Sequence, residues 1–340
     1  MVTYNCRTSG LYSLLRANDM DRIINEENIG FKIGPIINAA GRMYDDGAIK
    51  AYEVIVYDGP FREDLGNELI AINDMRKKEV QTAMEKLYEN IQANCLFGDY
   101  PLVVYEPNIP EGIVGILAGR LAEEKGVPSF VFTDSDDPNV YKGSARSACG
   151  VHLKDLLDAS SETLYKYGGH ADAAGLSVEK DKYYDMIAAF AENIPEPEEA
   201  VDTSTIYYDL EIPVCDVDAV LKELATYAPF GEGNPQIRFK VTDFELSPRY
   251  SSFYGTLGDT NQHLKLYGVN IDAIGFNMVE KYQGMGEPKR LNLIGTLGVN
   301  YFMGRSSVQV TLDDFADSGK RTGKTRFAKL LEEKAKQRYS

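Results

Sequence analysis

Three short segments of this chain combine small residues with one or two polar side chains. They span residues 34–43, 142–147 and 168–175. Small residues allow a backbone to approach a ligand closely. Arginine, histidine and hydroxyl side chains bind phosphate through charge-assisted hydrogen bonds. The three segments together predict one cleft that binds phosphate groups.

Ser144 and Arg146 lie two residues apart in a predicted strand at 141–147. Alternate residues of a strand point to the same face, so both side chains are expected on one side of the sheet. A guanidinium group beside a hydroxyl binds a phosphate through a two-pronged contact and one further hydrogen bond. The alternative interpretation is an edge-strand arginine paired with a nearby carboxylate.

Gly168 and Gly169 precede His170 at the end of a predicted helix over residues 153–167. Left-handed backbone at the two glycines would let successive N–H groups converge on an anion. The imidazole of His170 would donate to the same phosphate or orient a water, which makes it the one candidate for a catalytic role. The alternative is a helix-capping turn with a partly buried histidine.

Arg42 follows Asn38 by one helical turn, with alanines and a glycine between them. The pair offers a guanidinium and an amide beside closely approachable backbone, or else a helix cap or a buried packing turn. Gly112 and Gly115 would place the start of a helix at 111–125 near a phosphate. Helix packing explains those two glycines equally well.

The order of the expected elements indicates two kinds of domain. Apolar residues recur every three or four positions between about 60 and 94, which predicts one long connecting helix. Strands at 102–105, 128–132, 141–147 and 174–178 then alternate with helices, which is typical of a mixed α/β domain. Six short strand candidates between 237 and 312 favour an OB-like β-barrel, with a β-sandwich as the alternative.

The composition is that of a globular protein of two or three domains. Hydrophobic residues make up 44% and charged residues 26% of the 340 residues. The chain has neither an apolar run of membrane-spanning length nor the apolar core of a secretory signal near Met1. The cysteines and histidines share no metal-ligand spacing: Cys6, Cys95, Cys149, Cys215, His152, His170 and His263. A reducing cytoplasm and no membrane partner are therefore expected.

Charge is distributed unevenly along the chain. The net charge is −16, which by itself argues against a polyanionic partner. Binding depends on where the positive groups lie, however, and not on their sum. Residues 192–203 read as an acidic, proline-broken linker, whereas 318–340 form a basic tail. Such a tail suits contact with nucleic acid, or else forms a solvated terminal helix.

Several motifs together resemble the RecJ branch of the DHH phosphoesterases over residues 1 to 317. They are Ile-Asn-Ala-Ala-Gly-Arg-Met at 37–43, Glu-Gly-Ile-Val-Gly-Ile-Leu-Ala at 111–118, Lys-Gly-Ser-Ala-Arg-Ser at 142–147, Gly-Gly-His-Ala-Asp-Ala-Ala-Gly at 168–175, Ala-Pro-Phe-Gly-Glu-Gly-Asn-Pro at 228–235 and Ser-Val-Gln-Val at 307–310. The resemblance implies a 5′-to-3′ exonuclease on single-stranded DNA that acts in repair and recombination. It also implies a manganese- or magnesium-binding DHH lobe.

The resemblance also assigns roles along the chain. Residues 1–59 would be the tail end of the DHH lobe, 60–95 the connecting helix, 96–191 the DHH-associated substrate-binding domain and 204–317 the OB-like domain. Asn38, Arg42, Ser144, Arg146, Gly168, Gly169 and His170 would bind the phosphates of the strand. Tyr250, Phe253, Tyr254 and Tyr267 are candidates for stacking on its bases.

Two departures from the family pattern limit this assignment. Pro110 stands where the family often has a histidine, and no motif rich in aspartate and histidine occurs near the start. The only clustered aspartates there are Asp19, Asp21, Asp45 and Asp46, with no histidine beside them. We therefore expect no metal site in this chain, and a DHH lobe supplied by a separate chain or a longer gene product.

Two alternative functions remain open at this stage. One is a non-catalytic single-strand-binding or regulatory protein derived from such a nuclease. The other is a phosphodiesterase for small nucleotides, although an OB-like barrel is not needed for a dinucleotide substrate.

Overall fold

A computed structural model describes most of the chain and divides it into two compact units, residues 1–201 and 202–340. The described residues are 10–18, 26–57, 59–96, 99–196, 206–249, 251–258, 260–302, 305–318 and 324–325. Tyr250, Asp19, Asp21, residues 197–203 of the predicted linker and most of the basic tail lie outside them. No described helix is both long and apolar enough to cross a bilayer.

The first unit begins with a group of helices around a shared core. They are α1 (Gly10–Ala17), α2 (Glu26–Asn28), a π-helical turn (Ile29–Ile33), α3 (Gly34–Met43), α4 (Gly47–Val56) and α5 (Arg62–Ala93). Leu14, Ile36 and Val54 are buried here against Leu69 and Ile72 of α5. This core fixes the position of α3, which contains Asn38 and Arg42.

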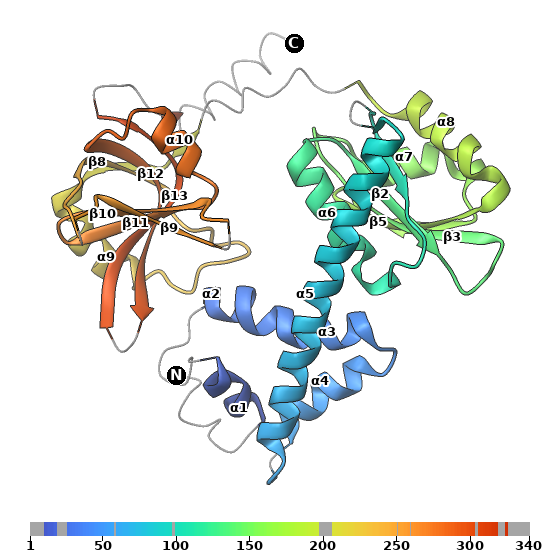
Figure 1. The fold of residues 1–340 in the computed structure, drawn as a ribbon, viewed down its shortest axis with the longest axis horizontal. Helices are drawn as coiled ribbons and strands as arrows, with labels where there is room; N and C mark the ends of the chain where they lie inside the picture. The colour runs from blue at the N-terminus through green and yellow to red at the C-terminus, as the bar shows by residue number, and fades with distance from the viewer. Residues whose placement is uncertain are drawn as a thin grey trace. The chain divides into compact units, whose positions relative to one another are not determined.

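The predicted connecting helix is confirmed as α5, a single helix of 32 residues. At 1.5 Å per residue it is about 48 Å long. Its first half packs in the helical core, and its second half packs through Val80, Leu87 and Ile91 against the next domain. Figure 1 shows α5 running from the group of helices to the next domain, so one helix contributes to both hydrophobic cores.

A five-stranded mixed sheet follows, with strand order β1-β2-β3-β5-β4. Its elements are β1 (Leu102–Tyr105), α6 (Glu111–Lys125), β2 (Ser129–Asp134), β3 (Val140–Arg146), α7 (Leu153–Ala159), β4 (Lys166–Gly169), β5 (Ala173–Glu179) and α8 (Tyr183–Asn193). β1 and β2 pair in parallel and the other pairs are antiparallel.

Helices cover both faces of this sheet. Alternation along β2 places Val131 in the core shared with α5 and α6, and Phe130 and Phe132 in the core shared with α7 and α8. α6 ends at Lys125, and the next residue, Gly126, has a φ of +67°, the left-handed geometry that commonly terminates a helix.

The predicted helix over 153–167 is wrong beyond its first two turns. α7 ends at Ala159, a short 3₁₀ turn spans Ser161–Thr163, and β4 occupies Lys166–Gly169. The Thr163 hydroxyl donates to the Ser160 carbonyl at 2.8 Å, a local bond of the kind that competes with helix continuation. Tyr167 then enters the ladder opposite Leu176, where aromatic residues are favoured. Gly168 is consequently a strand residue and not a helix cap.

The second unit is built on one seven-stranded sheet with order β7-β8-β12-β13-β11-β10-β9. Its elements are β6 (Tyr207–Tyr208), β7 (Leu210–Pro213), α9 (Val217–Leu224), β8 (Phe239–Glu245), β9 (Tyr254–Leu257), β10 (His263–Tyr267), β11 (Ile271–Gly275), α10 (Val279–Gly284), β12 (Arg290–Phe302), β13 (Arg305–Asp317) and β14 (Lys324–Thr325). All six predicted strands of this region are present, with β12 and β13 longer than expected.

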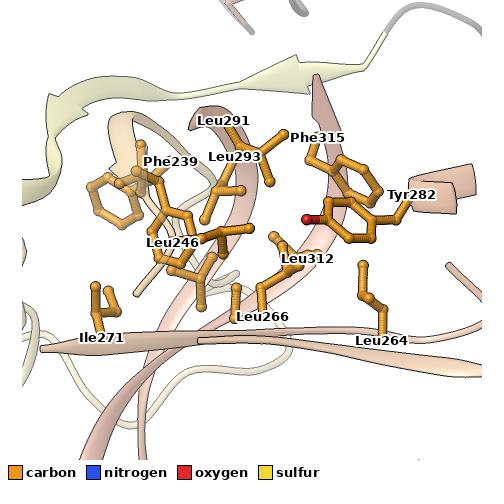
Figure 2. Packing of buried hydrophobic residues seen from close by; sticks show 14 of the residues in the cluster. Phe239, Leu246, Leu264, Leu266, Ile271, Tyr282, Leu291, Leu293, Leu312 and Phe315 are labelled. Atoms are coloured by element: carbon orange, nitrogen blue, oxygen red, sulfur yellow. The ribbon is translucent and has the colours of Figure 1, made fainter. Parts of the chain in front are cut away.

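This sheet curves around a single core (Figure 2). Phe239 of β8 and Leu266 of β10 belong to one buried cluster, although three strands separate β8 from β10 in the sheet. A bridge between Leu246 and Gly268 also brings the end of β8 to the end of β10. The sheet therefore partly closes on itself, as a small barrel does, and does not form two packed layers.

Candidate phosphate-binding site

The face of β3 that packs against α6 carries Ser144 and Arg146 side by side, as the strand alternation predicts. A Cβ atom at Gly115 of α6 would lie 3.3 Å from Arg146 Nη2 and 3.5 Å from Ser144 Oγ. Ala145 between them points the other way and is fully buried. Both polar side chains therefore lie against the glycine side of α6.

Gly112 brings α3 and α6 together at this point. A Cβ atom at Gly112 would lie only 1.9 Å from the Arg42 carbonyl oxygen, so no larger residue fits without a shift of backbone. Arg42 in turn donates from Nη1 to the Gly112 carbonyl at 3.1 Å. The close approach of the two helices thus places the Arg42 guanidinium beside the site formed by β3.

Arg146 lies in an interior strand and has no carboxylate partner among the described residues. β3 lies between β2 and β5, which argues against the edge-strand interpretation. Its Nη1 donates to the Ala145 carbonyl at 2.9 Å. Burial, and then the positive charge of Arg42, lower the pKa of the Arg146 guanidinium. Two cations that repel each other in a half-buried place favour the binding of an anion between them.

A pocket of about 400 Å³ opens next to these side chains. Ser144, Gly168 and Gly175 line it, and Lys142 stands at its wall, paired with Glu111. Gly168 pairs with Gly175 across the β4–β5 ladder, and a Cβ atom at either position would meet nothing within 4 Å. The pocket floor is therefore bare strand backbone that a ligand can approach closely.

His170 lies exposed in the β4–β5 hairpin, and the predicted anion-binding nest is wrong. The His170 N–H donates to the Ala173 carbonyl at 2.9 Å and is not free to bind an anion. Gly168 has ordinary strand geometry, and only Gly169 has positive φ, at +156°. Glycine is needed at 169 because a Cβ atom would lie 2.5 Å from the Ala173 carbonyl oxygen. Asn38 is exposed on α3, one turn before Arg42.

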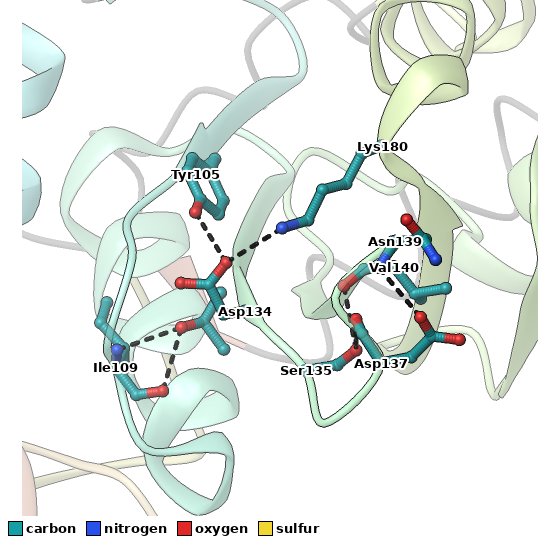
Figure 3. A network of polar contacts seen from close by, with 9 residues as sticks. Tyr105, Ile109, Asp134, Ser135, Asp137, Asn139, Val140 and Lys180 are labelled. Atoms are coloured by element: carbon teal, nitrogen blue, oxygen red, sulfur yellow. Dashed lines mark hydrogen bonds and ion pairs between the residues drawn. The ribbon is translucent and has the colours of Figure 1, made fainter.

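The start of α6 is held by a polar network at the ends of β1 and β2 (Figure 3). The Thr133 hydroxyl accepts from the Ile109 N–H and donates to the Ile109 carbonyl, both at 3.0 Å. Next to it, Asp134 accepts from the Tyr105 hydroxyl at 2.9 Å and lies 3.5 Å from Lys180 Nζ. These bonds fix the turn that leads into α6, and with it Gly112 and Gly115.

The described residues offer no ligand set for a divalent metal. No group of three or more histidine, cysteine, aspartate or glutamate side chains gathers among them. Asp45 and Asp46 are exposed and lie in the turn between α3 and α4. Manganese or magnesium therefore does not fit the side chains in the described part of the chain, and the candidate phosphate site offers guanidinium and hydroxyl groups instead.

The predicted base-stacking residues of the second unit are mostly part of its interior. Phe253 and Tyr254 pack against the core, and the Tyr254 ring lies 5.2 Å from that of Tyr282. Tyr267 stacks under the Arg249 guanidinium at 5.5 Å. Phe276, which is 60% exposed, was not expected from the sequence. A single aromatic residue between a strand and a helix gives no periodic signal.

Arg76 was also missed from the sequence. It is half-buried on α5, and its Nε is buried without a hydrogen-bond partner. The signal was available, since Asn73 and Arg76 interrupt the apolar spacing that continues at Val80. In a long charged helix, however, a polar residue is ordinarily taken as part of the solvated face.

Comparison with known proteins identifies two domains in the chain. Residues 98–196 match the DHHA1 domain and residues 208–314 match the RecJ OB domain. These matches confirm the predicted order of an α/β DHH-associated domain followed by an OB-like domain.

Curated relatives match nearly the whole chain but only part of their own length. The single-stranded-DNA-specific exonuclease RecJ of Escherichia coli is 30% identical over 330 residues, which cover 91% of this chain and 54% of that protein. The RecJ of Haemophilus influenzae is 29% identical over a match that covers 91% of this chain and 55% of that protein. The chain thus spans about half the length of these relatives. The crystal structure of Thermus thermophilus RecJ with Mn²⁺ shares the fold, with a TM-score of 0.70 at 23% identity over 94% of this chain and 45% of that one.

Proposed function

Since the chain contains the DHHA1 and OB domains of the RecJ family in the family's order, we propose that it binds the backbone of single-stranded DNA for a RecJ-like 5′-to-3′ exonuclease. The named relatives are exonucleases specific for single-stranded DNA. The hydrolytic step, which the family resemblance makes metal-dependent, belongs to a DHH lobe outside the described residues.

One observation carries the proposal: Arg42 and Arg146 approach each other without a carboxylate partner beside a pocket floored by bare strand. A phosphodiester placed there receives the Arg146 fork, the Ser144 hydroxyl and the Arg42 guanidinium. The absent side chains at Gly168 and Gly175 leave room for the sugar-phosphate backbone. His170, exposed in the β4–β5 hairpin, would contact a neighbouring phosphate.

The OB domain contributes to the same task by guiding the strand. OB folds bind single strands through backbone charge and base stacking, worth about 1–3 kcal/mol per stacked base. Phe276 is the most exposed aromatic side chain of the described part of this domain and lies 5.2 Å from the His263 ring. We assign it, ahead of the core aromatics, as the base-stacking residue.

A separate chain that supplies the metal-binding lobe is part of the proposal. Helix α4 exposes an apolar side: Ile49, Tyr52 and Val56 are 63%, 64% and 52% exposed. Their spacing of three and four residues places them on one helix face. Such a face on the helical part of the first unit suits contact with another folded lobe.

The alternative is a non-catalytic single-strand-binding or regulatory protein. The lack of a metal ligand set among the described residues favours it. Both functions require the same phosphate site and differ only in whether cleavage accompanies binding.

The test measures binding and cleavage of a 5′-phosphorylated oligothymidylate by the purified chain, with manganese and with chelator. We expect binding that Arg146→Met weakens and Lys182→Met leaves unchanged, since Lys182 pairs with Glu179 at 2.7 Å. The absence of binding by the unmodified chain would refute the proposal. Chelator-sensitive cleavage by the chain alone would place the metal site inside it. Binding that becomes cleavage only on addition of a DHH-lobe protein would separate the nuclease from its non-catalytic alternative.

A further inference from the structure

The pocket beside Ser144 continues to a second row of polar side chains. Lys142, Ser177 and Lys166 line this part of it. In the sheet, Lys142 of β3 is opposite Ser177 of β5, and Ser177 is opposite Lys166 of β4. Residues directly opposite each other in antiparallel strands point to the same face, and Lys142 shares its face with Ser144 by strand alternation. Three neighbouring strands therefore present a hydroxyl flanked by two lysines on the face of the phosphate site.

These side chains are accessible to a ligand. Lys166 is exposed and has no ion pair with a described carboxylate, and the half-buried Ser177 hydroxyl has no hydrogen bond to a described residue. Lys142 is paired with Glu111 of α6, but the two side chains are 51% and 41% exposed. An ion pair with this exposure contributes little stability, so a phosphate can compete for Lys142.

The second row lies one step along the strands from the first. Ser144 and Lys142 are two residues apart in β3, as are Gly175 and Ser177 in β5. Side chains two residues apart in a strand are separated by about 7 Å, which is also the spacing of consecutive phosphates in an extended single strand. The bare backbone at Gly175 leaves the way between the two rows open.

The series of phosphate-binding side chains ends at this second row. The next pair on the same face is Val140 and Glu179, which offers an apolar side chain and a carboxylate. Glu179 is itself paired with Lys182 at 2.7 Å. The sheet therefore has room for two phosphates along β3 and β5, with no cation left over for a third.

We propose that Lys142, Ser177 and Lys166 form a second phosphate subsite, which binds the phosphate next to the one at Ser144. The inference rests on the proposed function, because it follows the same strand by one nucleotide. It also gives Glu111 a role, since pairing with Lys142 withholds one of the two cations and restrains the affinity of the subsite. The chemical class of the ligand is a nucleotide whose sugar carries a phosphate at both ends.

The test compares a nucleoside that carries one phosphate with the same nucleoside carrying two. The probes are thymidine 5′-monophosphate and thymidine 3′,5′-bisphosphate, each competing against a labelled oligothymidylate. The unmodified chain should bind the bisphosphate about tenfold more tightly, the effect of one further set of charge-assisted contacts. Arg146→Met should weaken the binding of both probes, because it acts on the first subsite.

Substitutions in the second row should act on the bisphosphate alone. Lys166→Met and Ser177→Ala should each weaken its binding about threefold, the effect of losing one exposed contact. Lys142→Met should weaken it about tenfold, because the Glu111 carboxylate is then left unpaired beside the phosphate. Binding of the monophosphate should stay within about twofold in all three variants. The four side chains are exposed or half-buried, so the variants are expected to fold.

Glu111→Gln should change the affinity in the opposite direction. It releases Lys142, so bisphosphate binding should strengthen about threefold. If the pair only joined α6 to β3, loss of either partner would leave the ratio of the two affinities unchanged. Glu68→Gln is the matched control, since it removes the same charge from an ion pair with Lys50 at 2.7 Å in the helical part of the unit. It should not change the ratio.

Lys154→Met is the control for the lysines. Lys154 is paired with Asp158 on α7, which covers the other face of the sheet, and its loss should not change the ratio. Equal affinity of the unmodified chain for the two probes, or failure of both to displace the oligothymidylate, would refute the second subsite. An unchanged ratio in both Lys142→Met and Glu111→Gln would overturn it as well. Absence of oligothymidylate binding would instead refute the proposed function itself.

Discussion

The arginines of the two units have opposite surroundings. In the second unit, Arg249 forms a two-pronged ion pair with Asp272 at 2.9 and 3.0 Å, and the Asp272 side chain is only 4% exposed. In the first unit, Arg146 and Arg42 are close together with no carboxylate between them. Both arrangements place charge in a partly buried setting. Only the first unit leaves that charge uncompensated.

This difference distinguishes charge that is paired inside the fold from charge that has no carboxylate partner among the described residues. A buried ion pair is satisfied inside the fold, and removal of one partner leaves the other unpaired. A cluster of like charges is instead held in place by the packing around it, as Gly112 allows for α3 and α6. The net charge of −16 therefore conceals a local site of the opposite sign.

Arg146→Met gives the largest expected effect. Loss of the guanidinium should weaken binding of a 5′-phosphorylated oligonucleotide about a hundredfold, or about 3 kcal/mol, because two charge-assisted hydrogen bonds disappear. The free energy of unfolding should stay within about 0.5 kcal/mol, since methionine keeps the apolar stem and repulsion by Arg42 is relieved. Fluorescence anisotropy and urea unfolding measure the two quantities. A large loss of stability would show that Arg146 is structural, and the contrast with Arg249 would be lost.

Arg249→Met should produce the reverse pattern. The free energy of unfolding of the second unit should fall by about 2 kcal/mol, because Asp272 keeps only Lys265, at 3.8 Å. This is less than for a fully buried pair, since the Arg249 side chain is 43% exposed. Binding of thymidine 5′-monophosphate should not change. Arg290→Met is the control: its pair with Glu245 is exposed on both sides and is worth at most about 0.5 kcal/mol. Equal stability of the two variants would contradict the structural role of Arg249.

Gly175→Val tests the bare floor of the pocket. Open space surrounds the position of the new side chain, and a β-branched residue suits a strand, so stability should be kept or slightly raised. Oligonucleotide binding should fall about tenfold, the result of losing a few well-placed contacts. Gly143→Ala is the contrasting variant: Gly143 also lines the pocket, but a Cβ atom there would lie 2.6 Å from the Phe132 ring. It should lower stability. Full binding by Gly175→Val would exclude the floor from the site.

The sequence predicts those features of the fold and the site that depend on residues close together along the chain. Helix α6 was predicted at its exact bounds, because Pro110 precedes it and Gly126 terminates it by a local conformational preference. The strand alternation of Ser144 and Arg146 is equally local. β4 was missed because the leucines of the segment before it fit helical spacing. Only the pairing of β4 with β5 determines that residues 166–169 form a strand.

Gly112 was beyond prediction for a different reason. Gly112 is explained by a backbone contact with Arg42, 70 residues away. A sequence pattern reports on near neighbours along the chain, whereas this site depends on contacts of α6 with α3 and with β3.

Lys166→Met should have the smallest effect on single-strand binding. It compares an unpaired lysine of the pocket with Lys180, which lies near a carboxylate. Lys166 lines the pocket, is exposed, and has no ion pair with a described carboxylate, whereas Lys180 lies near Asp134 at 3.5 Å. A cation that neutralises one phosphate releases condensed counterions, so its loss should reduce the salt slope of single-strand binding by about 0.7. Affinity should fall only a few-fold at low salt, and Lys180→Met should leave both quantities unchanged. Anisotropy titrations over a range of salt concentrations measure the slope. If the two variants shifted it equally, proximity to a carboxylate would not distinguish structural from functional cations in this fold.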